Sequence, residues 1–181
     1  MNSTFPASYE CVLDPEFLGS GAFPNLHRYR DRSQRPHIAH LRHESGVEWY
    51  AELGKGELVT NGLTEAYTTP SSDHVLVVLN GSGYYVNARD PGRVSAVQIE
   101  PIKQVEALPE HDLLLLLSPC EVAAYAASGH LWTSERIALD GVRLIRPEGD
   151  QILVEVDMGD EEPHRVLLAL RTGAIDHLDG P

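Results

Sequence analysis

Five consecutive leucines, Leu113–Leu117, place the strongest constraint on the fold of this 181-residue chain. The run stops at Ser118-Pro119, and a second apolar run, Val122–Ala127, follows it. A short apolar run between turn residues is typical of a β-strand that is covered on both faces. Repeated short runs of this kind, separated by turn dipeptides, indicate antiparallel meanders. We therefore expect a mainly β protein in which the leucine run is a central strand that needs a second sheet or a second chain over it.

The same order of segments occurs at least twice. The apolar run Val75–Leu79 aligns with the leucine run, and each is followed by a turn, a tyrosine-bearing strand, another turn and a polar-alternating strand. In the first copy we predict that the last of these strands covers Val94–Ile102. A third, partial unit begins at Gln151–Val156. A period of roughly 40 residues with about four strands is typical of propeller blades.

Three segments carry a resemblance to known proteins. Tyr125–Trp132, with the sequence YAASGHLW, resembles the strand, Ser/Thr-Gly, spacer and Trp pattern of quinoprotein-type propeller blades, and Leu170–Ile175 resembles the same turn without the tryptophan. Leu131–Leu144 resembles a segment of uncharacterised bacterial β-rich proteins. The resemblance implies two to three blade-like meanders, whereas a closed propeller needs about four to eight. We expect either sheets packed as a β-sandwich or open blades that associate between chains, with Trp132 in the core.

The chain divides into two predicted regions. Residues 1–26 contain scattered prolines and a Gly19-Ser20-Gly21 break without apolar periodicity. We predict an irregular N-terminal arm over residues 1–45, with a short strand around Tyr9–Leu13 left open. Residues 46–181 form the β-repeat domain. The first residues lack a leader pattern, and no apolar run approaches the ~20 residues needed to cross a bilayer. Cys11 and Cys120 form no ligand motif and are expected to be free thiols, which favours the cytoplasm.

Charge is distributed unevenly along the chain. The formal net charge is −13, which argues against non-specific binding to nucleic-acid phosphates. The segment 27–43 is the exception, because it contains five arginines and one acid. Its charge is therefore +4, which leaves −17 for the remainder of the chain. We expect this segment to contact the acidic body of its own chain or of a second subunit in a homodimer, or to be solvated surface. A partner protein and nucleic acid are the alternatives. The candidate partner-binding residues are Arg28, Arg30, Arg32, Arg35 and Arg42.

Metal binding and catalysis have little support in the sequence. His37, His40 and His43 are candidate metal ligands, but on a strand His40 would point away from the other two, so ordinary polar surface is the simpler interpretation. The acidic cluster Asp157, Asp160, Glu161 and Glu162 lacks the order of a calcium loop, and we expect a solvated hairpin turn. Cys120 lies beside Glu121, which would raise the thiol pKa, and no base is placed near it by the sequence. We predict no catalytic residue and no cofactor.

Three functions remain open. A non-enzymatic interaction or self-association module is the first, because apolar strands dominate and no catalytic motif occurs. A small-molecule or metal-dependent enzyme is the second, with a site that gathers acids and loop histidines, including His74 and His111. An acidic regulatory or immunity-type module that binds a basic partner protein is the third.

Overall fold

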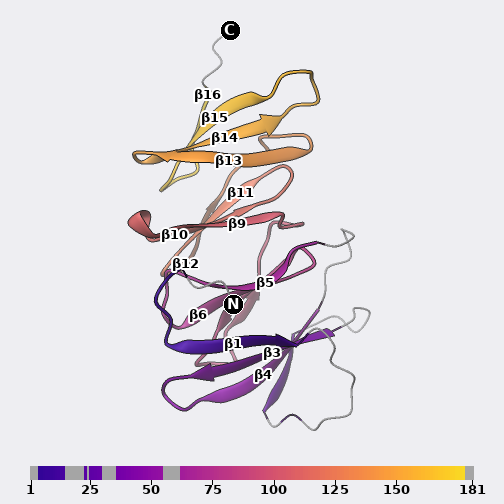
Figure 1. The fold of residues 1–181 in the computed structure, drawn as a ribbon, viewed down its shortest axis with the longest axis vertical. Coiled ribbons are helices and arrows are strands. Elements are labelled where there is room, and N and C mark those ends of the chain that lie inside the picture. The colour runs from indigo at the N-terminus through magenta and orange to yellow at the C-terminus, as the bar shows by residue number, and fades with distance from the viewer. Residues whose placement is uncertain (1–3, 15–22, 24, 30–35, 55–61, 178–181) are drawn as a thin grey trace.

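Four β-sheets stacked face to face make up the protein (Figure 1). The computed structural model describes residues 4–14, 23, 25–29, 36–54 and 62–177. Within these residues the mainly β prediction is confirmed, and the sheets form a multilayered sandwich. None of the helical turns in the described residues is long and apolar enough to cross a membrane.

Each sheet is built from four strands that follow one another in the chain. The first sheet contains β1 (Tyr9–Asp14), β2 (Leu26–Tyr29), β3 (Pro36–His43) and β4 (Glu48–Gly54). The second contains β5 (Thr64–Thr68), β6 (His74–Leu79), β7 (Ser82–Asn87) and β8 (Val94–Ala96). The third contains β9 (Gln104–Leu108), β10 (Leu113–Leu117), β11 (Val122–Ala126) and β12 (Gly129–Thr133), with a 3-10 turn at Pro109–His111. The fourth contains β13 (Gly141–Glu148), β14 (Gln151–Asp157), β15 (His164–Ala169) and β16 (Ile175–His177).

The second, third and fourth sheets are antiparallel meanders with their strands in sequence order. The predicted repeat is visible in this topology, because β6, β10 and β14 are each the second strand of their sheet. The first sheet differs: its order is β1-β3-β4-β2, and β2 runs parallel to β4. The third repeat unit, predicted as partial, is a complete four-stranded sheet.

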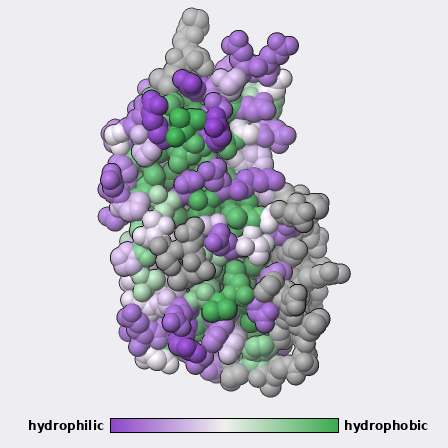
Figure 2. All heavy atoms as spheres, in the orientation of Figure 1, coloured by the Kyte–Doolittle hydropathy of each residue, from purple (hydrophilic) through white to green (hydrophobic). Residues whose placement is uncertain are grey.

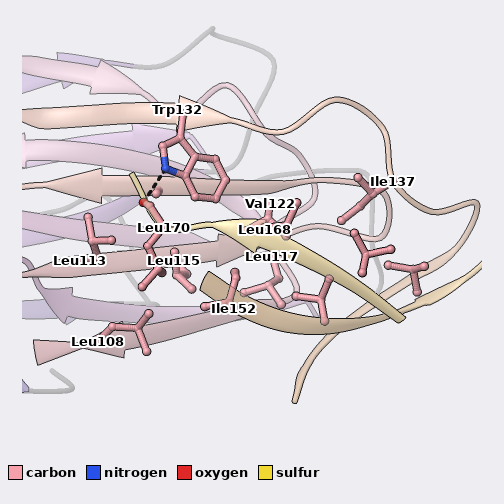
Figure 3. Packing of buried hydrophobic residues seen from close by; sticks show 14 of the residues in the cluster. Leu108, Leu113, Leu115, Leu117, Val122, Trp132, Ile137, Ile152, Leu168 and Leu170 are labelled. Carbon is pink, nitrogen blue, oxygen red and sulfur yellow. Dashed lines mark hydrogen bonds between the residues drawn. The ribbon is translucent and has the colours of Figure 1, made fainter. Parts of the chain in front are cut away.

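The leucine strand β10 lies in the interior of the stack. All five of its side chains are at most 1% exposed. Leu113, Leu115 and Leu117 point into the core shared with the fourth sheet (Figure 3), while Leu114 and Leu116 point into the core shared with the second. Side chains of a strand alternate between its faces, so a strand between two sheets needs apolar residues at every position. The predicted central strand, covered on both faces, is confirmed.

Two tryptophans link neighbouring sheets by equivalent hydrogen bonds. Trp49 on β4 donates its indole N–H to the carbonyl of Ala88 in the second sheet, at 2.8 Å. Trp132 on β12 donates to the carbonyl of Leu170, just after β15 in the fourth sheet, also at 2.8 Å (Figure 3). Both residues are at most 6% exposed. Trp132 therefore packs in the core, as the sequence predicted, and satisfies its one donor by joining two sheets.

The segment predicted as an irregular arm, residues 1–45, contains three strands. The short strand left open around Tyr9–Leu13 is β1, whereas β2 and β3 were not predicted. Ala39 and Leu41 face the core between the first two sheets, while His40 and Arg42 lie on the outer face. An outer strand of a stack has only one apolar face, so its sequence reads as mixed and basic rather than as a strand. β3 and β4 also pair across the boundary predicted at residue 45.

The strand predicted over Val94–Ile102 is too long, because β8 ends at Ala96. Beyond it, the amide of Val97 bonds the carbonyl of Gly83 at 2.8 Å, and the amide of Ile102 bonds that of Gly81 at 2.7 Å. Pro101 has no N–H to offer a strand ladder. Val97, Ile99 and Ile102 are nevertheless buried, in the core between the second and third sheets.

Candidate functional site

Both described arginines of the basic segment pair with acids of their own sheet. The Arg28 Nε atom lies 3.0 Å from a carboxylate oxygen of Glu52. Arg42 lies between Glu10 and Glu48, at 3.6 and 3.4 Å. The other three candidates, Arg30, Arg32 and Arg35, lie outside the described residues. Contact of this segment with its own chain is therefore present, and binding of a partner through it stays a prediction.

The three candidate metal ligands do not converge. His37 and His43 are buried on one side of β3, while His40 lies on the other side, stacked on Tyr50 at 4.4 Å between ring centroids. His40 Nε2 lies 2.7 Å from a carboxylate oxygen of Glu48. Across the described part of the chain, no group of three or more His, Cys, Asp or Glu side chains is arranged to hold a metal ion.

The remaining two histidines of the enzyme hypothesis lie apart. His74 hydrogen-bonds the hydroxyl of Ser71 at 2.8 Å and stacks on Tyr85 at 4.8 Å between ring centroids. Burial lowers the pKa of its imidazole, which favours the neutral ring. His111 lines a different hollow, beside Pro109 and Pro147. These histidines therefore do not form one shared site.

A groove beside the fourth sheet is a better candidate. One wall is the connector 134–140 between β12 and β13, which hydrogen bonds fix to both neighbouring sheets. The Ile137 amide bonds the carbonyl of Cys120 in the third sheet at 2.9 Å, and the Leu139 amide bonds that of Asp157 in the fourth at 2.8 Å. Ile137 is 8% exposed and anchors the connector in the core. This wall is therefore held in place before any ligand binds.

The groove has a volume of about 360 Å³, and half of its ten lining residues are apolar. The other half are polar: Glu135, Arg136, Asp160, His164 and Arg165. Its apolar side chains come from the connector and from β14, β15 and β16: Ile137, Val156, Val166 and Ile175. Met158, at the start of the β14–β15 turn, lines it as well and is 46% exposed. Leu139 on the neighbouring connector is 53% exposed. Large apolar side chains exposed beside an apolar groove are typical of a surface that binds a partner.

The excess of acidic side chains lies beside this groove, because its own lining has two acids and two arginines. A second groove of about 340 Å³, which shares Val156 and Asp160 with the first, is lined by Glu155, Asp157, Glu161 and Glu162. Two of the acids are paired, Glu155 with Arg143 at 2.7 Å and Asp160 with His164 at 2.6 Å. Glu161 and Glu162 form no ion pair with any residue that the structure describes. Figure 2 shows hydrophilic side chains over the end of the stack that carries the fourth sheet. The two grooves together are lined by six acids and three arginines, so this surface has an excess of negative charge.

The sequence predicted the acidic turn of this surface but not its apolar groove. The acidic cluster was predicted as a solvated hairpin turn, and it is the turn between β14 and β15. The apolar groove was missed, because its lining comes from the connector and three strands. The available signal was Leu139 and Met158, two apolar residues among acids and glycines.

Comparison with known protein families finds no family model that matches this chain. A search of curated proteins likewise finds no significant match.

Proposed function

We propose that the protein is a non-enzymatic binding module that docks a basic, partly apolar segment of another protein against the fourth sheet. The observation that carries this proposal is the apolar groove with exposed Met158 and Leu139 beside an acidic turn. An interface of this kind combines an apolar centre, which supplies affinity, with a charged rim, which supplies orientation and specificity.

Each part of the partner has a defined place. One large aliphatic or aromatic side chain would enter the groove and cover Val156 and Val166. Lysine or arginine beside it would reach Glu161 and Glu162, which have no cation of their own among the described residues. The net charge of −13 would also accelerate the approach of a basic partner. We place this interaction in the cytoplasm, an assignment supported by the unpaired thiols of Cys11 and Cys120.

A selection from random peptides tests the proposal without a known partner. Peptides displayed on phage are selected on the immobilised protein, and those retained are counter-selected on Met158→Asp and on Glu161→Lys/Glu162→Lys. Val12→Asp is the matched control, because Val12 is an apolar side chain, 60% exposed, on β1 in the first sheet. All four positions are at the surface, so the variants should remain folded.

We expect the selected peptides to share one large apolar residue next to Lys or Arg. Their binding, measured by calorimetry, should be lost in both groove variants, unchanged in Val12→Asp, and weakened by salt. Selected peptides without basic residues, or peptides that bind the groove variants as well as the unchanged protein, would contradict the proposal.

A further inference from the structure

A second groove lies in the middle of the stack, at the junction of the second and third sheets. It has a volume of about 370 Å³. Its second-sheet wall is formed by Tyr85 on β7, by Ser95 on β8 and by Gln98 just beyond that strand. Its third-sheet wall is formed by Tyr125 on β11, by the Ser128-Gly129 turn and by His130 on β12. This volume is near the lower limit for small-molecule sites and suits a ligand of one ring.

The lining contains no Asp, Glu, Lys or Arg, although the chain as a whole is strongly acidic. Its polar groups are hydroxyls, one carboxamide and one imidazole. Each of these groups can both donate and accept hydrogen bonds. Ser95, Gln98 and Ser128 use none of their side-chain atoms in hydrogen bonds with the described residues. The groove therefore offers several uncommitted, uncharged hydrogen-bonding groups.

Tyr125 is the central residue of this site. Its side chain is 5% exposed and lines the groove, and its hydroxyl makes no hydrogen bond with the described residues. The hydroxyl is not fully enclosed, so it is available to a ligand. A β-bulge between Ala124 and Tyr125 shifts the register with β12, and bulges of this kind redirect side chains beside functional sites. Burial, with Tyr85 nearby, raises the Tyr125 pKa to about 12, so the hydroxyl remains a neutral donor at physiological pH.

The arrangement of the aromatic rings restricts the shape of the ligand. The rings of Tyr85 and Tyr125 contact each other, with centroids 5.2 Å apart and planes 34° apart. His130 packs edge-on against Tyr125, with centroids 5.4 Å apart. A flat aromatic ligand could stack between two rings only if those rings were separated by about twice the ~4.5 Å distance of one stacked pair. This site therefore presents ring edges and hydroxyls to a ligand instead of a slot for a planar base.

We propose that this groove binds a neutral, hydroxyl-rich ring of the monosaccharide class. The hydroxyls of such a ring, which both donate and accept, match the Tyr125 and Ser128 hydroxyls and the Gln98 amide. Its uncharged state matches a lining that has no charge to neutralise an ionic group. This site is separate from the proposed docking groove and does not depend on it.

The test is an NMR titration of the isotope-labelled protein with glucose, galactose, mannose and N-acetylglucosamine, each measured separately. Glucuronate serves as the charged comparison. Tyr125→Phe removes the hydroxyl of this lining residue. Tyr67→Phe is the matched control, because Tyr67 belongs to the same buried cluster but donates its hydroxyl to Glu65, at 3.0 Å, outside the groove.

We expect at least one neutral sugar to shift the signals of Gln98, Tyr125 and His130 saturably, with a dissociation constant of about 1 mM, as suits a small ligand in an open site. Tyr125→Phe should weaken this binding about 5–10-fold, the effect of one hydrogen bond, and Tyr67→Phe should leave it unchanged. Glucuronate should bind more weakly than the neutral sugars. The proposal is overturned if no neutral sugar shifts these signals, if glucuronate binds best, or if Tyr125→Phe binds as tightly as Tyr67→Phe.

Discussion

The contact between Trp132 and Gly173 allows a quantitative test of how the third and fourth sheets are joined. Gly173 has a φ of +68°, and a Cβ atom at this position would lie 2.6 Å from Cε3 of Trp132. Gly149 has a similar φ of +63°, but a Cβ atom there would meet nothing within 4 Å. Replacing either glycine with alanine introduces left-handed strain of about 1–2 kcal/mol. Only the change at Gly173 also forces an atom into a packed indole, which costs about 1–3 kcal/mol more.

We therefore expect Gly149→Ala to lower the free energy of unfolding by about 1–2 kcal/mol and Gly173→Ala to lower it by about 2–5 kcal/mol. Urea titration followed by circular dichroism measures both values. In a Trp132→Leu background the excess cost at Gly173 should disappear, since the ring that causes it is gone. Equal costs for the two alanines in the unchanged background would refute the inference that Gly173 is required by the indole.

The other predictions concern burial, pH and charge. Leu115→Ala should lower the free energy of unfolding by about 3–5 kcal/mol, because the side chain is 0% exposed. Leu131 lies on an edge strand and is 38% exposed, so Leu131→Ala should lower the free energy by under about 1 kcal/mol in the same urea titration. The Tyr125 pKa is raised from 10.0 to about 12, so its contribution to stability is complete below pH 10 and is lost as the pH rises towards 12. The melting temperature should therefore fall less between pH 9 and pH 11 in Tyr125→Phe than in the unchanged protein. An equal fall in both would contradict this reasoning. Arg42→Ala should lower the free energy of unfolding by at most about 1 kcal/mol, since the ion pairs of Arg42 are exposed. Added salt should reduce the difference in urea midpoint between this variant and the unchanged protein.

The interior of this fold was more predictable than its ends. A strand that is buried on both faces carries an uninterrupted apolar run, so β10 could be located from Leu113–Leu117 alone. The outer strand β3 could not, because the acids that pair with its arginine lie on β1 and at the start of β4. Its sequence therefore suggested a basic arm, when half of its side chains belong to a core.

Both candidate sites depend on juxtapositions that the sequence does not encode locally. The docking groove joins Ile137 to Val166, and the central groove joins Ser95 to His130. Each pair comes from different strands or connectors, so its proximity follows from how the sheets stack. The acidic turn was found because its acids lie close together in the sequence, and the bulge before Tyr125 has no pattern by which to recognise it.

The meander topology has a consequence for the order in which the protein folds. Three of the sheets pair only strands that are neighbours in sequence, so each can form from local hairpins with short loops to close. In the first sheet, β2 pairs in parallel with β4, although β3 separates the two strands in the sequence. Parallel pairing of this kind forms more slowly than a hairpin. We expect the second to fourth sheets to assemble first, and the amide protons of β2 to be the last to gain protection from hydrogen exchange during refolding.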